Sequence, residues 1–217
     1  MIEKNKYIEI IAGLKHNPQS PIELVTDIQI IEDYETNAQQ DMGLIDNLPF
    51  YKFRMDLYRN PEGKLFRYCN VEYDRFGSAT LVVFHTPKDE FILLQKNYRV
   101  FVDQYVWEIP RGFADLNDKS TLDSAIRELY EETSIDLKKI EHKVCEIGRI
   151  YPDTGLTNNQ VSLYRVDINV EFEPVLKNND KNEYISHYRL IPVSEIRDFV
   201  PQIKDGFTLC ALAKAFL

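Results

Sequence analysis

Three glutamates stand close together in a segment whose spacing predicts a helix. Glu128, Glu131 and Glu132 are three and four residues apart, so a helix would bring their carboxylates onto one face. Like charges at this spacing repel by about 0.2–0.5 kcal/mol per pair, and Arg127 alone cannot neutralise three of them. A hard divalent cation, which takes oxygen ligands and sits between carboxylates and phosphate oxygens, would compensate them. A solvated acidic helix face is the alternative that these residues alone leave open.

The element that positions the glutamates is a predicted helix from about Ser120 to Ser134. Ser120 and Asp123 form a capping-box pattern that satisfies free amides of the first turn. A stripe of residues at helical spacing predicts the packed face. It consists of Leu122, Ala125, Ile126, Leu129 and Thr133. The glutamates fall beside this stripe, so we expect them to be held against the rest of the fold.

The residues around the glutamates resemble the Nudix box, GX5EX7REUXEEXGU with U an aliphatic residue. Residues 127–135 read RELYEETSI, Gly112 resembles the opening glycine, and residues 107–112 (WEIPRG) are similar to the lead-in of the ADP-ribose pyrophosphatase branch. One extra residue separates Gly112 from Arg127, so the first box glutamate falls on Asp118 or Lys119. Ser134 replaces the closing glycine, which makes a left-handed helix terminus costlier.

The resemblance implies a metal site and its ligands. Glu128, Glu131 and Glu132 would bind Mg²⁺, with Mn²⁺ as a substitute, and the backbone carbonyl of Arg111 would be a further ligand. Arg127 would orient Glu131, and both are assigned to catalysis. The implied reaction is attack by water on one phosphorus of a pyrophosphate, with cations neutralising charge on the phosphate oxygens.

Substrate contacts are implied on both sides of the lead-in. Arg99 ends a segment, residues 95–99 (QKNYR), that resembles the strand before the lead-in, where the branch has a substrate-binding arginine. Glu108 and Arg111 in the lead-in are assigned to substrate binding as well. For Arg99 the alternative is an ordinary surface arginine on a strand. Trp107 is interpreted as a core residue under the loop in preference to a stacking surface for adenine.

The resemblance also implies a general base, because in the ADP-ribose pyrophosphatase branch this is often a glutamate in a loop downstream of the box. The loop at residues 150–160 (IYPDTGLTNNQ) offers only amides where an acid is expected, and Asp153, its one carboxylate, suits the cap of a turn. Glu183 follows a polar loop at the entrance to a predicted strand, so it is our candidate base. A solvated residue at a strand entrance is the alternative for Glu183, and Glu131 is the alternative base.

The fold class predicted is α/β of the α+β type, because strands and helices alternate without strict βαβ order. The resemblance, which covers residues 77–217, implies an α/β/α sandwich around a mixed sheet. Residues 1–76 are expected to form an N-terminal appendage with a β-hairpin at residues 51–74. Because an isolated hairpin is marginal in water, we expect it to mediate a homodimer; the alternative is that it covers its own domain.

The remaining strands and helices are predicted from apolar runs and turn residues. Strands are expected at residues 79–85, 90–99, 145–150, 160–170 and 183–190, and helices at 193–199 and 206–217.

Composition excludes several functional classes. The chain of 217 residues has 26 basic and 35 acidic side chains, a net charge of −9, and no cluster of Lys and Arg free of carboxylates, which disfavours nucleic-acid binding. No window approaches the ~20 apolar residues of a membrane span. The three cysteines form no paired motif, so a reducing compartment, the cytoplasm, is expected.

The expected function is Mg²⁺-dependent hydrolysis of ADP-ribose to AMP and ribose 5-phosphate, or of a related nucleoside-diphosphate sugar. Other nucleoside diphosphates, such as a dinucleotide, NADH or coenzyme A, are the first alternative. A nucleotide sensor that does not cut its ligand is the second, and the presence of the box carboxylates disfavours it.

Overall fold

The computed structural model describes residues 4–13, 23–38, 43–47, 51–171, 174–181 and 183–217. The chain forms two compact units, each described here by itself. The first consists of Met1–Asp74 with Asp153–Asn158, and the second of Arg75–Pro152 with Asn159–Leu217. No helix in the described ranges is long and apolar enough to cross a membrane.

The second unit is built on a seven-stranded mixed sheet. Its strands are β5 (Gly77–His85), β6 (Glu90–Arg99), β7 (Gln104–Glu108), β8 (Arg111–Phe113), β9 (His142–Ile150), β10 (Val161–Asn169) and β11 (Ile185–Pro192). The main order is β11-β6-β5-β10-β9, with β7 paired to β6 and β8 to β5. The pair β10–β5 is parallel and the other pairs are antiparallel. The short strands β7 and β8, which carry the lead-in, were not predicted from the sequence.

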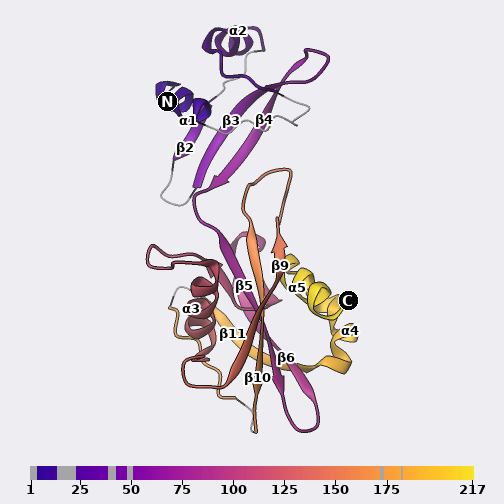
Figure 1. Cartoon of the computed structure of the whole chain (residues 1–217). Helices are drawn as coiled ribbons and strands as arrows, with labels where there is room; N and C mark the ends of the chain where they lie inside the picture. Colours follow the sequence, from indigo (N-terminus) through magenta and orange to yellow (C-terminus); the bar gives the residue numbers. More distant parts are fainter. Residues whose placement is uncertain (1–3, 14–22, 39–42, 48–50, 172–173, 182) are drawn as a thin grey trace. The chain divides into compact units, whose positions relative to one another are not determined.

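Helices cover both faces of this sheet (Figure 1). Helix α3 (Thr121–Thr133) packs on one face, while α4 (Ile196–Phe199) and α5 (Gly206–Phe216) lie on the other. Three short 3-10 segments complete the unit: η1 (Val100–Val102), η2 (Val193–Glu195) and η3 (Val200–Gln202). This arrangement confirms the predicted α/β/α sandwich around a mixed sheet.

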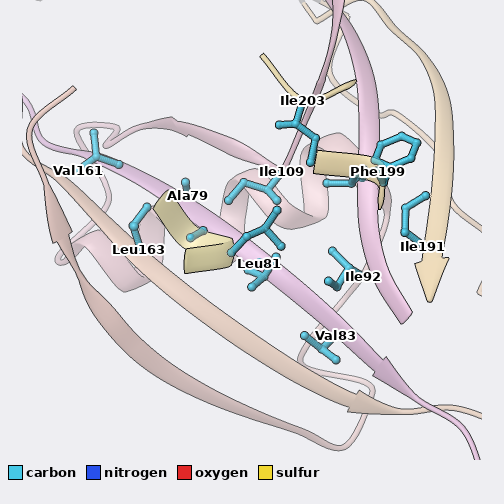
Figure 2. Packing of buried hydrophobic residues seen from close by; sticks show 13 residues of the cluster. Ala79, Leu81, Val83, Ile92, Ile109, Val161, Leu163, Ile191, Phe199 and Ile203 are labelled. Carbon is cyan, nitrogen blue, oxygen red and sulfur yellow. The ribbon is translucent and has the colours of Figure 1, made fainter. Parts of the chain in front are cut away.

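Alternation along the central strand β5 explains the two layers. Leu81 and Val83 point into a core shared with α4 and α5, whereas Val82 and Phe84 pack with Leu129 of α3. All these side chains are buried, as expected for a strand covered on both faces. Figure 2 shows the first core, in which residues from β5, β6, β10 and β11 meet the segment after α4.

The first unit is larger than the predicted hairpin. Strands β3 (Tyr51–Arg59) and β4 (Leu65–Tyr73) pair along their whole length, as their alternation predicts. Strand β3 also pairs with β1 (Glu23–Leu24) and β2 (Gly43–Asn47), and helices α1 (Lys4–Ala12) and α2 (Ile28–Ala38) complete the unit.

A separate small core holds the first unit together. Tyr7, Ile11, Val25, Ile31 and Leu57 are buried against one another. Helix α2 and strands β1 and β2 were not predicted, because their few apolar residues are dispersed among polar ones and meet only in the folded unit. The hairpin therefore has a core of its own on one face, which removes the marginality of an isolated hairpin.

Candidate active site

Helix α3 begins where the capping pattern predicts. The Ser120 hydroxyl accepts a hydrogen bond from the amide of Asp123 at 3.2 Å. The Asp123 carboxylate in turn accepts from the amide of Lys119 at 3.1 Å and from the Ser120 hydroxyl at 3.0 Å. These bonds satisfy free donors of the first turn, so the loop that follows Gly112 enters the helix in a defined orientation.

The C-terminus of α3 is anchored to a distant loop. Ser134 takes a left-handed conformation with φ 65°, a cost for a residue with a side chain. Its hydroxyl donates to the carbonyl of Lys177 at 2.9 Å and accepts from the Asn179 side chain at 2.9 Å, which offsets that cost. The Glu131 carbonyl accepts from the amides of Asn179 at 2.6 Å and Asp180 at 3.1 Å. The loop leading to Glu183 is thereby fixed to the helix that carries the glutamates.

The three glutamates do not form a solvated face. Glu132 is fully buried, Glu128 is nearly so, and only the side chain of Glu131, 37% exposed, reaches solvent. Arg127 binds two of them through one nitrogen: its Nη1 lies 2.9 Å from Glu128 Oε1 and 2.8 Å from Glu131 Oε2. Burial of this kind is costly for carboxylates unless charge partners offset it.

Asp118, one of the two candidates for the first box glutamate, contacts Arg127. Its Oδ2 lies 3.0 Å from Arg127 Nη2. No ion pair of Lys119 is found among the described residues. Of the two positions that the inserted residue left open, Asp118 is therefore the one that contacts the box arginine.

Gly112 forms a wall of the carboxylate site. A β-carbon built on Gly112 would lie 2.0 Å from Glu128 Oε1 and 2.1 Å from its Cδ, closer than any real contact. Strand β8 holds this backbone in place, because Gly112 pairs with Ser78 of β5. The glycine therefore permits Glu128 to lie directly on the lead-in backbone.

We expect Gly112→Ala to displace the Glu128 carboxylate and to lower kcat about a hundredfold, as misplacement of a reacting group by about 1 Å can do. Gly13→Ala is the matched control, because a β-carbon there meets only ordinary contacts at 3.5 Å. The measurement is kcat for the best substrate, with circular dichroism to verify folding. Full activity of folded Gly112→Ala would show that Glu128 need not occupy this place.

Burial raises the pKa of two glutamates, Glu128 and Glu132. It raises the pKa of Glu128 to about 7, although the charge of Arg127 acts in the opposite direction. Burial also raises the pKa of Glu132 well above its usual range, against a hydrogen bond from Gln95 and with a further rise from the charge of Glu183. Both groups would ionise more readily beside a cation.

Two polar side chains of strand β6, Gln95 and Asn97, donate hydrogen bonds to the carboxylates of the site. Gln95 and Asn97 are fully buried. Gln95 Nε2 donates to Glu132 Oε2 at 2.9 Å, and Asn97 Nδ2 donates to Glu108 Oε1 at 3.1 Å and to Glu183 Oε2. Sequence reasoning missed both amides; their alternation with Arg99 after the apolar run of residues 91–94 was the signal.

Glu108 contacts the two other predicted substrate-binding residues, Arg99 and Arg111. Fully buried, it accepts two hydrogen bonds from Arg99, at 2.9 Å from Nε and 2.5 Å from Nη2. Arg111 Nη2 lies 3.6 Å from Glu108 Oε2 and 3.5 Å from Asp205 Oδ1, and the guanidinium carbon lies 4.6 Å from the centre of the Phe207 ring. Arg99 is therefore a fixed member of a buried network and differs from an ordinary surface arginine.

The start of α5 fixes the lead-in. Asp205 caps the helix through its Oδ2, which accepts from the amide and the hydroxyl of Thr208 at 2.8 and 2.7 Å. The same hydroxyl accepts from the amide of Ile109 at 3.0 Å. At the other side of the loop, the amide of Arg111 donates to Glu132 Oε2 at 3.0 Å. The lead-in is thus held between α5 and α3.

Glu183 lies beside this network. Its carboxylate accepts from Asn97 and lies 3.5 Å from Arg99 Nη1, while its carbonyl accepts from the Asn178 side chain at 2.8 Å. The Glu183 side chain is partly exposed. Strand β11 begins two residues later, at Ile185, so the predicted start of this strand at Glu183 was too early.

Asp153, the one carboxylate of the loop at residues 150–160, caps a turn. Asp153 Oδ1 accepts a hydrogen bond from the amide of Gly155 at 2.9 Å. This bond is the cap that the residue types of the loop predict. Asp153 belongs to the first compact unit, together with residues 154–158.

Trp107 is half-buried and packs against the core of the second unit. Its ring meets the Phe199 ring edge-on with centroids 5.8 Å apart, and it borders the core shared by α4 and α5. This placement agrees with its interpretation as a core residue.

A cavity of about 520 Å³ opens beside the network, within the range of small-molecule sites. Its polar lining includes Arg99, Glu108, Arg111, Glu183, Lys204 and Asp205. The structure therefore brings the four residues assigned from the sequence to substrate and base, Arg99, Glu108, Arg111 and Glu183, into one pocket.

The donors of the site suit a hard divalent cation. In the described part of the chain, no three His, Cys, Asp or Glu side chains converge in a ready-made metal cluster. Arg127 binds Glu128 and Glu131, and Gln95 binds Glu132. Glu132 Oε1, Gln95 Oε1 and Asn97 Oδ1 are nevertheless buried without a hydrogen-bond partner among the described residues. Oxygens of this kind are the ligands that Mg²⁺ takes, so the residues present fit the cation.

Comparison with known proteins identifies related sequences. The model of the NUDIX domain matches residues 75–209. An ADP-ribose pyrophosphatase of Saccharomyces cerevisiae is 28% identical over 141 residues, which are 59% of this chain and 58% of the yeast protein. Nudix hydrolase 14, chloroplastic, of Arabidopsis thaliana is 25% identical over 162 residues, 68% of this chain and 52% of the plant protein. The chain thus spans little more than half the length of these curated relatives.

A solved structure shares the fold. The crystal structure of an ADP compounds hydrolase superposes with a TM-score of 0.59 at 15% identity, covering 81% of this chain and 92% of that chain. At this identity the likeness concerns the fold alone.

Proposed function

Because the chain belongs to the NUDIX domain family, we propose that it hydrolyses the pyrophosphate bond of a nucleoside diphosphate, with ADP-ribose or a related nucleoside-diphosphate sugar as its substrate. The products from ADP-ribose would be AMP and ribose 5-phosphate. One observation carries the proposal: the buried glutamates of α3 lie against the lead-in backbone at Gly112, and the same lead-in lines a cavity with Arg99 and Glu183.

The cation site comprises Glu128, Glu131, Glu132 and the backbone carbonyl of Arg111. Mg²⁺ is the proposed ion, with Mn²⁺ as a substitute, and when bound it would neutralise negative charge on the phosphate oxygens. Arg127 orients Glu128 and Glu131 through its Nη1 contacts. The orphan oxygen of Glu132 supports this assignment.

The substrate is oriented by the network around Glu108. This buried carboxylate fixes Arg99 and contacts Arg111, so both guanidinium groups are held before the substrate arrives. Planar donors in fixed orientation are suited to phosphate oxygens. Glu108 thus acts on the substrate by positioning the two arginines.

Glu183 is the proposed general base. It would take a proton from the water that attacks one phosphorus, while the bond from that phosphorus to the bridging oxygen breaks and the second phosphate leaves. Its place in the cavity beside Arg99 supports the role. Asn97 and the anchored loop of Asn178 hold it there.

The substrate class is tested by a hydrolysis screen of the purified protein with Mg²⁺. The panel comprises ADP-ribose, other sugar nucleotides, NADH, dinucleoside polyphosphates and nucleoside triphosphates. We expect ADP-ribose or another nucleoside-diphosphate sugar to give the highest kcat/KM, since the yeast relative is an ADP-ribose pyrophosphatase. A higher kcat/KM for NADH or a dinucleotide would reassign the substrate, and no turnover in the panel would favour a sensor.

We also propose that residues 77–217 are the hydrolase domain and that residues 1–76 form an appendage that joins two copies of the chain. Tyr58, Phe66 and Tyr68 form an aromatic cluster on the hairpin, with ring centroids 6.0 and 6.2 Å from Tyr58, and Tyr68 is exposed. Because Leu57 packs in the core of the appendage, the alternation of β3 places Tyr58 on the opposite face.

We expect light scattering at micromolar concentration to give the mass of a dimer. Tyr68→Glu should shift the mass toward the monomer, since it places a charge in the aromatic cluster. The matched control is Tyr130→Glu, which alters an exposed tyrosine of the other unit. A wild-type mass of one chain would contradict the proposal.

A further inference from the structure

We propose that the mouth of the cavity beside Glu183 binds the aromatic base of the nucleotide, with Tyr184 as its stacking surface. The inference deepens the proposed function and rests on it, because it takes the substrate to be a nucleoside diphosphate. It assigns one half of the cavity to the base and leaves the other half, at Glu108 and Arg111, to the phosphates.

Apolar side chains surround the mouth of the cavity and are open to solvent. Tyr184 is 63% exposed, and Val100 and Val102, which line the same cavity, are exposed as well. Exposed apolar groups that gather around a concave site indicate a ligand that covers them. A planar base fits this surface, because every base offers a π-face to an aromatic ring.

The backbone around the mouth is fixed before a ligand arrives. The carbonyl of Tyr184 accepts a hydrogen bond from the amide of Tyr98 at 3.3 Å. On the other side, η1 closes with a bond from the amide of Asp103 to the carbonyl of Val100 at 3.2 Å, and the Tyr98 hydroxyl donates to the Asp103 carboxylate. A preorganised stacking surface binds with a smaller loss of conformational entropy.

Polar groups at the rim suit the edge of a base. Lys204 Nζ donates to Gln104 Oε1 at 2.7 Å, and both side chains line the cavity. This bond leaves the Gln104 amide nitrogen and further ammonium hydrogens as donors. Ring nitrogens of a purine are acceptors. Arg99 and Arg111, which also line the cavity, are paired with Glu108 and Asp205, and the proposal assigns them to the phosphates.

The test is calorimetric titration of the full chain with two probes in Mg²⁺ buffer, AMP and ribose 5-phosphate. Tyr184→Ala should weaken AMP binding about tenfold or more, the effect of removing a stacked ring. It should leave the affinity for ribose 5-phosphate unchanged within the error of the titration. Tyr184→Phe, which keeps an aromatic ring, should bind AMP with the affinity of the wild type. Tyr105→Ala is the matched control, because Tyr105 on β7 is also an exposed tyrosine (49%) but does not line the cavity.

Three results would overturn the base site. They are AMP affinity unchanged in Tyr184→Ala, equal losses for the two probes, and absence of AMP binding to the wild type. Because the titration requires no turnover, its outcome is separate from that of the hydrolysis screen. A wild type that binds AMP through Tyr184 and cleaves nothing in the panel would contradict the proposed function and leave the base site standing.

Discussion

Glu132→Gln is expected to lower kcat by about a thousandfold or more, because it removes a carboxylate charge from the proposed cation site. The same substitution should leave the fold intact. Glu132 is fully buried, one of its oxygens has no hydrogen-bond partner among the described residues, and burial raises its pKa well above the usual range. The substitution removes the free-energy cost of burying a carboxylate charge. The melting temperature of Glu132→Gln without Mg²⁺ should therefore be equal to or above that of the wild type.

Two measurements separate this prediction from a general loss of structure. Mg²⁺ should raise the melting temperature of the wild type, because a ligand stabilises the folded state that binds it, and should have much less effect on Glu132→Gln. Glu195→Gln is the matched control and should behave as wild type, because Glu195 is exposed and lies outside the proposed site. Full Mg²⁺-dependent turnover in both Glu132→Gln and Glu131→Gln would end the ligand assignment.

Glu183→Gln should lower kcat by roughly 10²–10⁴, the usual contribution of a general base, with little change in KM. The amide keeps the size of the side chain and an oxygen that accepts from Asn97, but it cannot take a proton. The readout is the pair of kcat and KM values, again with Glu195→Gln as control. If Glu183→Gln is near wild type while box substitutions abolish turnover, the proton passes to Glu131 or directly to solvent.

The box helix was predictable because its determinants are local. The cap at Ser120, the spacing of Glu128, Glu131 and Glu132, and the glycine at 112 all lie within one short segment. Periodicity in such a segment defines both the helix and the face on which the carboxylates lie.

The partners of these groups could not be predicted, because they come from distant parts of the chain. Gln95 contacts Glu132 across 37 positions, and Asn97 contacts Glu183 across 86. Sequence spacing also left Asp118 and Lys119 as equal candidates for the first box position. Only the folded loop shows which of the two meets Arg127.

The N-terminal unit was underestimated for a different reason. Its core is assembled from single apolar residues, such as Ile11, Val25 and Ile31, each in a polar stretch. No window of the sequence has a strong period there, so only the long alternating strands of the hairpin could be identified.

The most direct test of the central claim is product analysis of ADP-ribose incubated with the purified chain, with Mg²⁺ and with a chelator. We predict equal amounts of AMP and ribose 5-phosphate with Mg²⁺, and neither product with the chelator or in Glu132→Gln. Formation of ADP and free ribose, or equal cleavage in the presence of the chelator, would contradict cation-dependent hydrolysis of the pyrophosphate bond at this site.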